Sequence, residues 1–191
     1  MMAGGGSVPL DRALIERARG GDRDAYARLA QAASHRWFAI ALRVLRDDEA
    51  ARDVLQAALV QVWRDLPSLR DPDRFDAWSY RLVINACRSA RRRNRHPVVS
   101  LDVALDPPTV GDSQLSVARR DELERAFARL SVEQRAVLVL LYYEDRSVAE
   151  IAATLGISAG TVKSRLHAAR AAMRAAIDAD SRVPVRAGEP A

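Results

Sequence analysis

The sequence predicts an all-α protein with two small helical domains joined by an extended linker, the second domain containing a helix-turn-helix. Three observations support this prediction. Apolar residues recur three or four positions apart through most of the chain, as the buried face of a helix requires. Of the 191 residues, 49% are hydrophobic but only 5% are aromatic, which favours compact helical units over sandwiches and barrels. The helical period is lost over one long stretch that contains three prolines and a glycine.

That interruption sets the expected domain boundaries. Five segments follow from it: residues 1–9, Gly-rich and disordered; residues 10–96, the first domain; residues 97–114, an extended linker with acidic residues and prolines; residues 115–178, the second domain; and residues 179–191, a disordered tail.

The positive charge of the chain is concentrated in one segment. The formal net charge is +5, yet residues 76–96 hold six Arg and one Asp, whereas residues 97–118 hold three Asp and no basic residue. A local basic surface favours a polyanionic partner such as nucleic acid.

Several classes of protein are disfavoured by composition. A single cysteine, Cys87, excludes an internal disulfide and a multi-cysteine zinc site, and it is expected to be a small packed residue in a reducing compartment. The three histidines lie in unrelated settings, so we expect no metal, no cofactor and no catalytic residue. No apolar run approaches the roughly eighteen residues of a transmembrane helix, and residues 1–9 lack a targeting pattern, so the protein is predicted to be cytoplasmic without membrane insertion.

Three helices are expected before residue 67. The first runs around Leu10 to Arg19 and ends at two glycines, and the second runs from Asp22 or Asp24 to about Leu45. The third covers about Asp48 to Leu66 and is stopped by Pro67. Besides its core stripe, the third helix has a second, mixed face, and the apolar Val60 on that face indicates a protein partner. The face comprises Asp53, Gln56, Ala57, Val60 and Arg64.

The segment from Asp71 to Arg95 is predicted to be a DNA-engaging helix. Asp71 suits the N-cap and Pro72 the first helical position, where its missing N–H costs nothing. One face should be buried: Phe75, Trp78, Leu82, Ala86 and Ala90. The opposite face should be exposed: Tyr80, Arg81, Ile84, Arg88, Arg91, Arg92 and Arg95. A solvated basic helix end would account for the arginines alone. The interleaved tyrosine and isoleucine favour nucleic acid, because rings stack on unpaired bases while guanidiniums hold the backbone.

The second domain is expected to begin with a helix from Leu115 to Leu130. Capping boxes at Ser131 to Gln134 and at Ser147 to Glu150 start the next two helices, and Ser158 caps a last helix that runs to about Ile177. The spacing of Ala152, Gly156 and Val162 suits a helix-turn-helix, which needs a small residue at the contact, a glycine in the turn and a β-branched residue that packs the second helix. A plain αα-hairpin is the competing interpretation.

The last helix carries the pattern expected of a recognition helix. Val162, Leu166, Ala169 and Met173 should face inward. Small polar residues lead the outer face and basic residues follow, which suits base edges near the N-terminal turns and phosphates farther along. The outer residues are Gly160, Ser164 and His167, with Lys163, Arg170 and Arg174 on one flank.

These residues give the chain a resemblance to bacterial RNA polymerase sigma factors of the extracytoplasmic-function class, within the sigma-70 family. The resemblance covers about Asp22 to Ile177. In the first domain it rests on ARDVLQ at residues 51–56 through Trp63 and on WSYRLVIN at residues 78–85; in the second, on EIAA at residues 150–153, LG at residues 155–156, GTVKSRL at residues 160–166 and AR at residues 169–170. The second set alone is also similar to response-regulator DNA-binding domains, so the pairing of both sets makes the resemblance specific.

The resemblance implies a partner for each surface. RNA polymerase core, through its beta-prime and beta subunits, would be bound by Asp53, Gln56, Val60, Trp63 and Arg64. The minus-ten element, first double-stranded and then opened, would be bound by Trp78, Tyr80, Arg81, Asn85, Arg88, Arg91 and Arg92. The minus-35 element would be bound by Thr161, Lys163, Ser164, Arg165, His167, Arg170 and Arg174. An anti-sigma factor is a further candidate partner, and nothing in the family is catalytic. Arg52 and Ala57 depart from the family, because many relatives carry acidic residues there.

Two other classes compete with this interpretation. A helix-turn-helix transcriptional regulator that is not a sigma factor would need only the second domain and a sensor, but the first domain has no ligand-cavity signature and carries its own basic and aromatic helix. An enzyme would need a catalytic constellation that the sequence does not contain.

Overall fold

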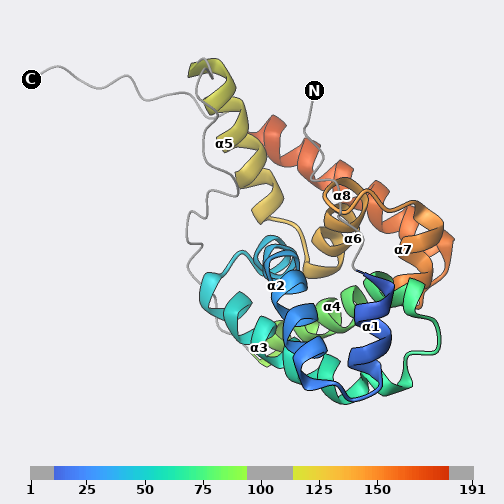
Figure 1. Cartoon of the computed structure of the whole chain (residues 1–191). Coiled ribbons are helices and arrows are strands. Elements are labelled where there is room, and N and C mark those ends of the chain that lie inside the picture. The colour runs from blue at the N-terminus through green and yellow to red at the C-terminus, as the bar shows by residue number, and fades with distance from the viewer. Residues whose placement is uncertain (1–10, 94–113, 181–191) are drawn as a thin grey trace, which may run out of the picture.

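A computed structural model of the chain describes residues 11–93 and 114–180. Over these residues the chain forms eight α-helices and two short 3-10 helices, with no strand. The all-α prediction is therefore confirmed. Helices α1 to α4 form the first unit and helices α5 to α8 the second, and Figure 1 shows the second unit lying across one side of the first, with α5 and α8 projecting away from it. The predicted linker and both predicted tails lie largely outside the described residues.

The first unit is built around the long helix α2. Its helices are α1 (Arg12–Arg19), α2 (Arg23–Leu45), α3 (Asp48–Asp65) and α4 (Phe75–Arg93), and α2 contacts all three others. Aspartates begin three of these helices: the carboxylates of Asp11, Asp22 and Asp47 each accept a hydrogen bond from a backbone N–H of the first turn. The core is apolar and fully buried, with Leu29, Trp37, Ile40, Val44, Val62 and Phe75 among its members.

Helix α4 begins one turn later than predicted. Asp71 does accept a hydrogen bond from the Asp73 N–H, and Pro72 follows it, but the first turn is the 3-10 helix η2 (Pro72–Arg74). A preceding 3-10 helix, η1 (Leu66–Ser68), contains the proline that ends α3. The two 3-10 turns bracket the loop that leads into α4.

The second unit contains a helix-turn-helix and two additional helices. It consists of α5 (Gln114–Ala128), α6 (Val132–Tyr142), α7 (Val148–Leu155) and α8 (Ala159–Asp180). Both predicted capping boxes form, at Ser131 with Gln134 and at Ser147 with Glu150. Gly156 adopts φ 65° and ends α7, as the predicted turn required, and Val162 on α8 is fully buried.

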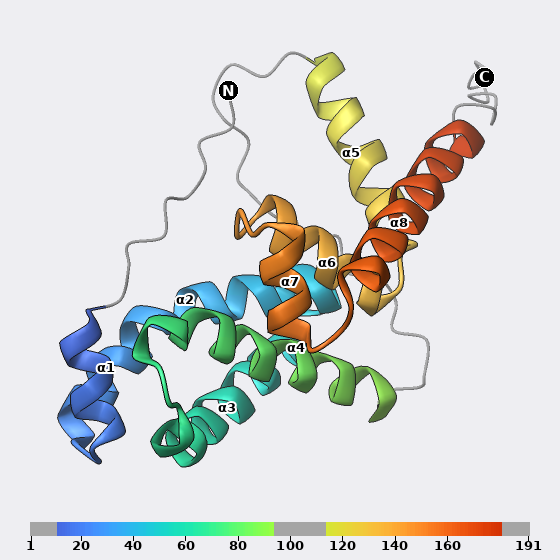
Figure 2. The ribbon, with the colours of Figure 1, turned by 90° about the vertical axis from the view of Figure 1, so that its right-hand side faces the viewer.

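The two units share one hydrophobic core. Helix α6 contacts α2 and α4, α7 contacts α4, and Figure 2 shows α6 and α7 between α8 and the helices of the first unit. Buried residues of both units belong to a single cluster, from Ile15 to Ala169. We call this contact the seam, and the packed state of the units the closed arrangement. Cys87 lies in that core and is buried, as predicted. Among the described residues, no helix combines the length and the apolar character that a membrane span requires.

The turn at Gly156 gives a first testable prediction. Gly156→Ala should lower the free energy of unfolding by about 1–2 kcal/mol, because an L side chain in the left-handed region is strained even though open space surrounds the added Cβ. Gly160→Ala is the matched control, since Gly160 lies within α8 and its added Cβ would meet only the Ser158 Oγ at an ordinary 3.6 Å. That variant should gain about 0.5–1 kcal/mol. Chemical denaturation measures both, and equal signs for the two changes would contradict the assigned turn.

Candidate nucleic-acid interface

Helix α8 presents the outer face that the sequence predicted. The Ser158 hydroxyl accepts a hydrogen bond from the Thr161 N–H at 3.0 Å and so caps the helix. Val162, Leu166 and Ala169 are buried, and Met173 is half-buried. Gly160, Lys163, Ser164, His167, Arg170 and Arg174 are all exposed, whereas Thr161 and Arg165 are half-buried. The Ser164 hydroxyl donates to the Thr161 carbonyl at 3.0 Å, which leaves its lone pairs for a donor outside the chain.

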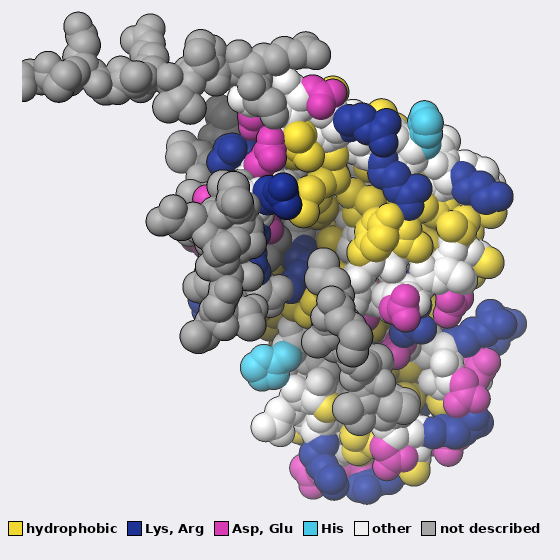
Figure 3. Space-filling view, turned by 90° about the horizontal axis from the view of Figure 1, so that it is seen from above, with side chains coloured by type: hydrophobic (Ala, Val, Ile, Leu, Met, Phe, Trp, Pro, Cys, Tyr) yellow, Lys and Arg dark blue, Asp and Glu magenta, His cyan; other side chains and the backbone are white. Residues whose placement is uncertain are grey.

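Arg170 on α8 is partly engaged by the second unit itself. Its guanidinium donates to the Tyr142 hydroxyl at 2.7 Å and lies 5.9 Å from the centre of that ring. Tyr142, Tyr143 and Leu123 are exposed, and Figure 3 shows hydrophobic side chains gathered in one area with Lys and Arg side chains along its border. Arg174, by contrast, has no ion pair or hydrogen bond recorded within the described part of the chain, so it is the less encumbered cation for a phosphate.

Helix α4 presents only part of its predicted outer face. Arg81, Asn85, Arg91 and Arg92 are exposed, and Trp78 is half-buried with its ring 5.9 Å from that of Phe75. Tyr80, however, is only 1% exposed and Ile84 is fully buried. The prediction that these two residues are exposed is therefore wrong for the closed arrangement. The physical reason is that the second unit packs on the part of this face that carries Tyr80 and Ile84, while Arg81, Arg91 and Arg92 stay exposed.

Glu144 of the second unit contacts Tyr80 of the first unit at the seam. The Tyr80 hydroxyl donates to Glu144 Oε2 at 2.5 Å, and Arg36 Nε lies 3.4 Å from the same oxygen. The side chain of Glu144 is only 3% exposed, and this burial raises the pKa of its carboxyl. Burial, and then the hydrogen bond to the carboxylate, also raise the pKa of Tyr80 above its ordinary value. The Tyr80 hydroxyl therefore stays protonated and can donate its hydrogen bond. The buried Glu144 carboxylate needs this donor because it has little access to water.

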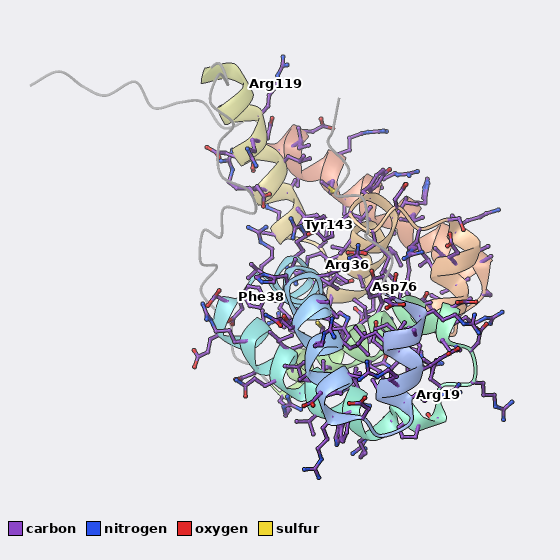
Figure 4. All side chains as sticks on the ribbon, in the orientation of Figure 1. Arg19, Arg36, Phe38, Asp76, Arg119 and Tyr143 are labelled. Carbon is purple, nitrogen blue, oxygen red and sulfur yellow. The ribbon has the colours of Figure 1, made fainter. Side chains whose placement is uncertain are left out.

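A second set of charges extends this contact. Arg146, in the loop after α6, lies 3.3 Å from Asp76 on α4 and 5.7 Å from the centre of the Tyr80 ring. Arg36 on α2 approaches Asp76 at 3.9 Å. Figure 4 labels Arg36, Asp76 and Tyr143, which come from α2, from α4 and from the end of α6 and gather at the seam. Arg43 on α2 adds a cation–π contact, 3.7 Å from the centre of the Tyr143 ring.

Two predicted DNA contacts, one from each unit, face each other at the seam. Arg88 on α4 has its pKa lowered, first by burial and then by the positive charge of Arg165 on α8. Arg88 Nε and Arg165 Nη1 are both buried without a hydrogen-bond partner. Two guanidiniums held this way oppose closure.

The outer face of α3 is the surface that the closed arrangement leaves uncovered. Its predicted residues are exposed: Asp53, Gln56, Val60, Trp63 and Arg64. Val60 is 68% exposed and Trp63 is 37% exposed, with the Trp63 ring 4.8 Å from that of Tyr26. The Tyr26 hydroxyl donates to the Leu59 carbonyl and so holds this pair against α3. An exposed valine and a positioned tryptophan on a polar helix face form a surface suited to a protein partner.

Sequence reasoning missed the residues of the seam. Glu144 and Arg146 follow an apolar helix in a short loop, and Arg36 lies among ordinary polar positions of α2, so no local pattern marks them. The described residues contain no group of His, Cys, Asp and Glu that could hold a metal ion.

Comparison with known proteins connects both units to one family. A family model described as Sigma-70 region 2 matches residues 29–96, and one described as Sigma-70, region 4 matches residues 120–173. The "ECF RNA polymerase sigma factor SigM" of Mycobacterium tuberculosis (strain ATCC 25618 / H37Rv) is 35% identical over 169 residues, covering 88% of this chain and 85% of the relative. The "ECF RNA polymerase sigma factor SigL" of the same strain is 39% identical over 140 residues, covering 70% of this chain and 78% of the relative.

Solved structures have the same fold. The chain is similar to the protein in "Structure of CnrH in complex with the cytosolic domain of CnrY", with a TM-score of 0.62 and 30% identity over 89% of this chain and 98% of the other. It also matches the sigma factor RpoE of Bartonella quintana, solved with the anti-sigma factor NepR, with a TM-score of 0.63 over 81% of this chain and 98% of the other. At 23% identity, the second match supports the fold alone.

The seam predicts different effects for two Tyr to Phe changes. Tyr80→Phe leaves the buried Glu144 without its hydroxyl donor and should weaken the closed arrangement by about 1–3 kcal/mol. Tyr26→Phe removes a comparable hydroxyl within the first unit and should leave the seam unchanged. Energy transfer between dyes on Ala27→Cys in α2 and Ala171→Cys in α8, both exposed sites, reports the separation of the units. A separation unchanged by Tyr80→Phe, or changed equally by Tyr26→Phe, would contradict the role of this hydrogen bond.

Proposed function

Because the chain belongs to the extracytoplasmic-function class of the sigma-70 family, it is a promoter-directing sigma factor, and we propose which of its surfaces contact the polymerase and the promoter. The observation that carries the assignment is the presence of two candidate DNA helices, α4 and α8, on separate units of one chain. A helix-turn-helix regulator would need only the second unit, so the match of region 2 to the first unit rules out that alternative.

The outer face of α3 is the proposed contact with RNA polymerase core, through its beta-prime and beta subunits. Support comes from the exposure of Val60 and Trp63 beside Asp53, Gln56 and Arg64. An apolar centre with a polar rim is the usual composition of a protein interface. The Tyr26 ring behind Trp63 would hold the indole in place before the polymerase arrives, which lowers the entropy cost of binding.

Helix α8 is the proposed reader of the minus-35 element. Thr161, Lys163, Ser164 and His167 lie on its N-terminal half, where base edges are contacted in such motifs. Arg170 and Arg174 lie one to two turns farther along and would bind phosphates. Arg165 is half-buried and faces Arg88, so it would reach DNA only when the units separate.

Helix α4 is the proposed reader of the minus-ten element. In the closed arrangement Tyr80 is covered by the second unit, while Arg81, Asn85, Arg91 and Arg92 remain exposed. Tyr80 can stack on an unpaired base only after the seam opens. We therefore assign the closed arrangement to the free factor, and the open one to the factor on polymerase and promoter.

Two further properties belong to the same proposal. The two solved neighbours are complexes with a partner, the cytosolic domain of CnrY and the anti-sigma factor NepR. A partner of this kind is proposed for this chain as well. The cytoplasm is the proposed location, since polymerase and promoter DNA are there and the one cysteine is a free thiol.

The polymerase contact can be tested on α3. Gln56→Ala combined with Val60→Asp should weaken binding to core polymerase roughly tenfold or more, because a charge would enter the centre of the interface. Unfolding should change by no more than about 0.5 kcal/mol, since both side chains are exposed. Leu123→Asp is the control, an acidic replacement of an exposed apolar residue in the second unit. Unaltered affinity of the α3 variant for core would refute the contact.

The minus-35 contact can be tested on α8 by comparing two kinds of variant. Ser164→Ala should alter which bases are preferred, at a cost of about 1–3 kcal/mol for a lost base contact, and should leave the salt dependence unchanged. Arg174→Ala should weaken all sequences alike and reduce the slope of log affinity against log salt by about one. Binding of a minus-35 library to the full chain at several salt concentrations separates the two. The reverse pattern would mean that α8 is rotated relative to the assigned orientation.

A further inference from the structure

A cavity lined by arginines lies where the two units meet. Its volume is about 220 Å³, and its charged lining consists of Arg46, Asp47, Arg91, Arg129 and Arg135. The first three come from the α2–α3 junction and from α4, and the last two from the second unit. The cavity is therefore made jointly by the two units and exists only in the closed arrangement.

Two of these guanidiniums are buried and incompletely bonded. Arg46 and Arg135 are each 7% exposed, and the Nε atom of each is buried without a hydrogen-bond partner. Arg46 does pair with Glu124, at 2.6 Å through Nη1, but Arg135 has no ion pair recorded within the described residues. A buried donor without a partner is costly, so native proteins seldom leave one in place unless a ligand completes it.

The acidic residues nearby do not neutralise the cavity. Asp47 caps α3 by accepting the Ala50 N–H, and Asp180 pairs with Arg129 at 2.7 Å. Of the four lining arginines, Arg91 and Arg135 then remain without a carboxylate. Burial first, and then the positive charges of Arg46 and Arg91, lower the pKa of Arg135 to about 10. The cavity lining itself holds four guanidiniums and one carboxylate, Asp47, while the Glu133 carboxylate acts on Arg135 from outside the lining.

We propose that this cavity binds the phosphate or diphosphate group of a small molecule, and that the bound group holds the two units together. Two unpaired guanidiniums match the charge of about −2 on a phosphate group, whereas a carboxylate would neutralise only one. Guanidinium forks bind phosphate oxygens in pairs, and Arg91 and Arg135 in the cavity lining supply such forks. The cavity volume is several times the roughly 30 Å³ that one water molecule occupies in the liquid. The cavity therefore has room for one or two phosphates but not for a nucleic-acid strand.

The location of the cavity gives its ligand a regulatory effect. A ligand that contacts both units binds the closed arrangement and not the open one, so it shifts the population toward closure by mass action. The face of α4 that carries Tyr80 would stay covered while the ligand is bound. This effect on promoter contact rests on the proposed function, but binding of the anion itself does not.

The test is calorimetric titration of the full chain with inorganic phosphate, pyrophosphate and ATP, at constant ionic strength set with chloride. The expected result is saturable binding of pyrophosphate with one site per chain. Binding of ATP with equal affinity would identify the terminal phosphates of a nucleotide as the source, and binding of pyrophosphate or phosphate alone would identify the inorganic ion. Absence of saturable binding by all three would overturn the proposal.

Variants decide whether the cavity is the site. Arg91→Gln and Arg135→Gln should each weaken the binding at least about tenfold, and Arg91 is exposed at the rim, so its replacement leaves the core intact. Arg93→Gln is the matched control, an exposed arginine two residues along the same helix that does not line the cavity. Equal losses in Arg91→Gln and Arg93→Gln would show a diffuse charge effect and overturn the site.

The same dyes on Ala27→Cys and Ala171→Cys test the effect on the arrangement. Saturating pyrophosphate should increase the closed population in the parent chain and fail to do so in Arg91→Gln. Binding without any change in dye separation would overturn the claim that the anion holds the units together. Failure of the proposed promoter contacts would leave these binding results unaffected, so the two proposals can be distinguished.

Discussion

The buried carboxylate of Glu144 is the constraint on which the closed arrangement depends. It is held by the Tyr80 hydroxyl and by Arg36, two residues of the other unit, in a place where water is nearly excluded. A charge or a polar group buried this way costs free energy unless all its partners are present. The contact is therefore specific, because only one register of the two units satisfies it. It is also reversible, because water can satisfy the same groups once the units part. An entirely apolar seam would lack both properties.

The closed arrangement leaves one of the proposed functional surfaces exposed and covers parts of the others. The α3 face with Val60 is open, whereas the α4 face with Tyr80 is covered and the α8 residue Arg165 is turned toward Arg88. A polymerase could therefore be engaged before either DNA surface is complete. The unsatisfied arginines at the seam reduce the free energy needed to open it, and phosphates of a promoter would supply their missing partners. In this scheme the order of contacts follows from which side chains are accessible at each stage.

Local features of the fold were predictable from the sequence, but the packing of the units was not. Asp22, Asp47 and the capping boxes act within one helical turn, and Gly156 acts within one turn of chain, so short patterns reveal them. The helical wheel of α4 placed Tyr80 and Ile84 on the outer face, and it could not say that a second unit covers them. An apolar and aromatic face with arginines suits unpaired DNA, and it suits a second helical unit equally well. That choice depends on long-range partners such as Glu144, sixty-four residues away from Tyr80, and no local pattern encodes them.

The single hydrophobic core shared by both units has a consequence for the lifetime of the protein in the cell. When the seam opens, Ile84 on α4 and the facing surface of α6 lose their cover, and a large apolar surface meets water. Proteases and chaperones recognise such surfaces, and unprotected copies aggregate. A molecule released from its complex must either close again or be removed. Closure of the seam therefore protects the free molecule, because it returns this apolar surface to the core.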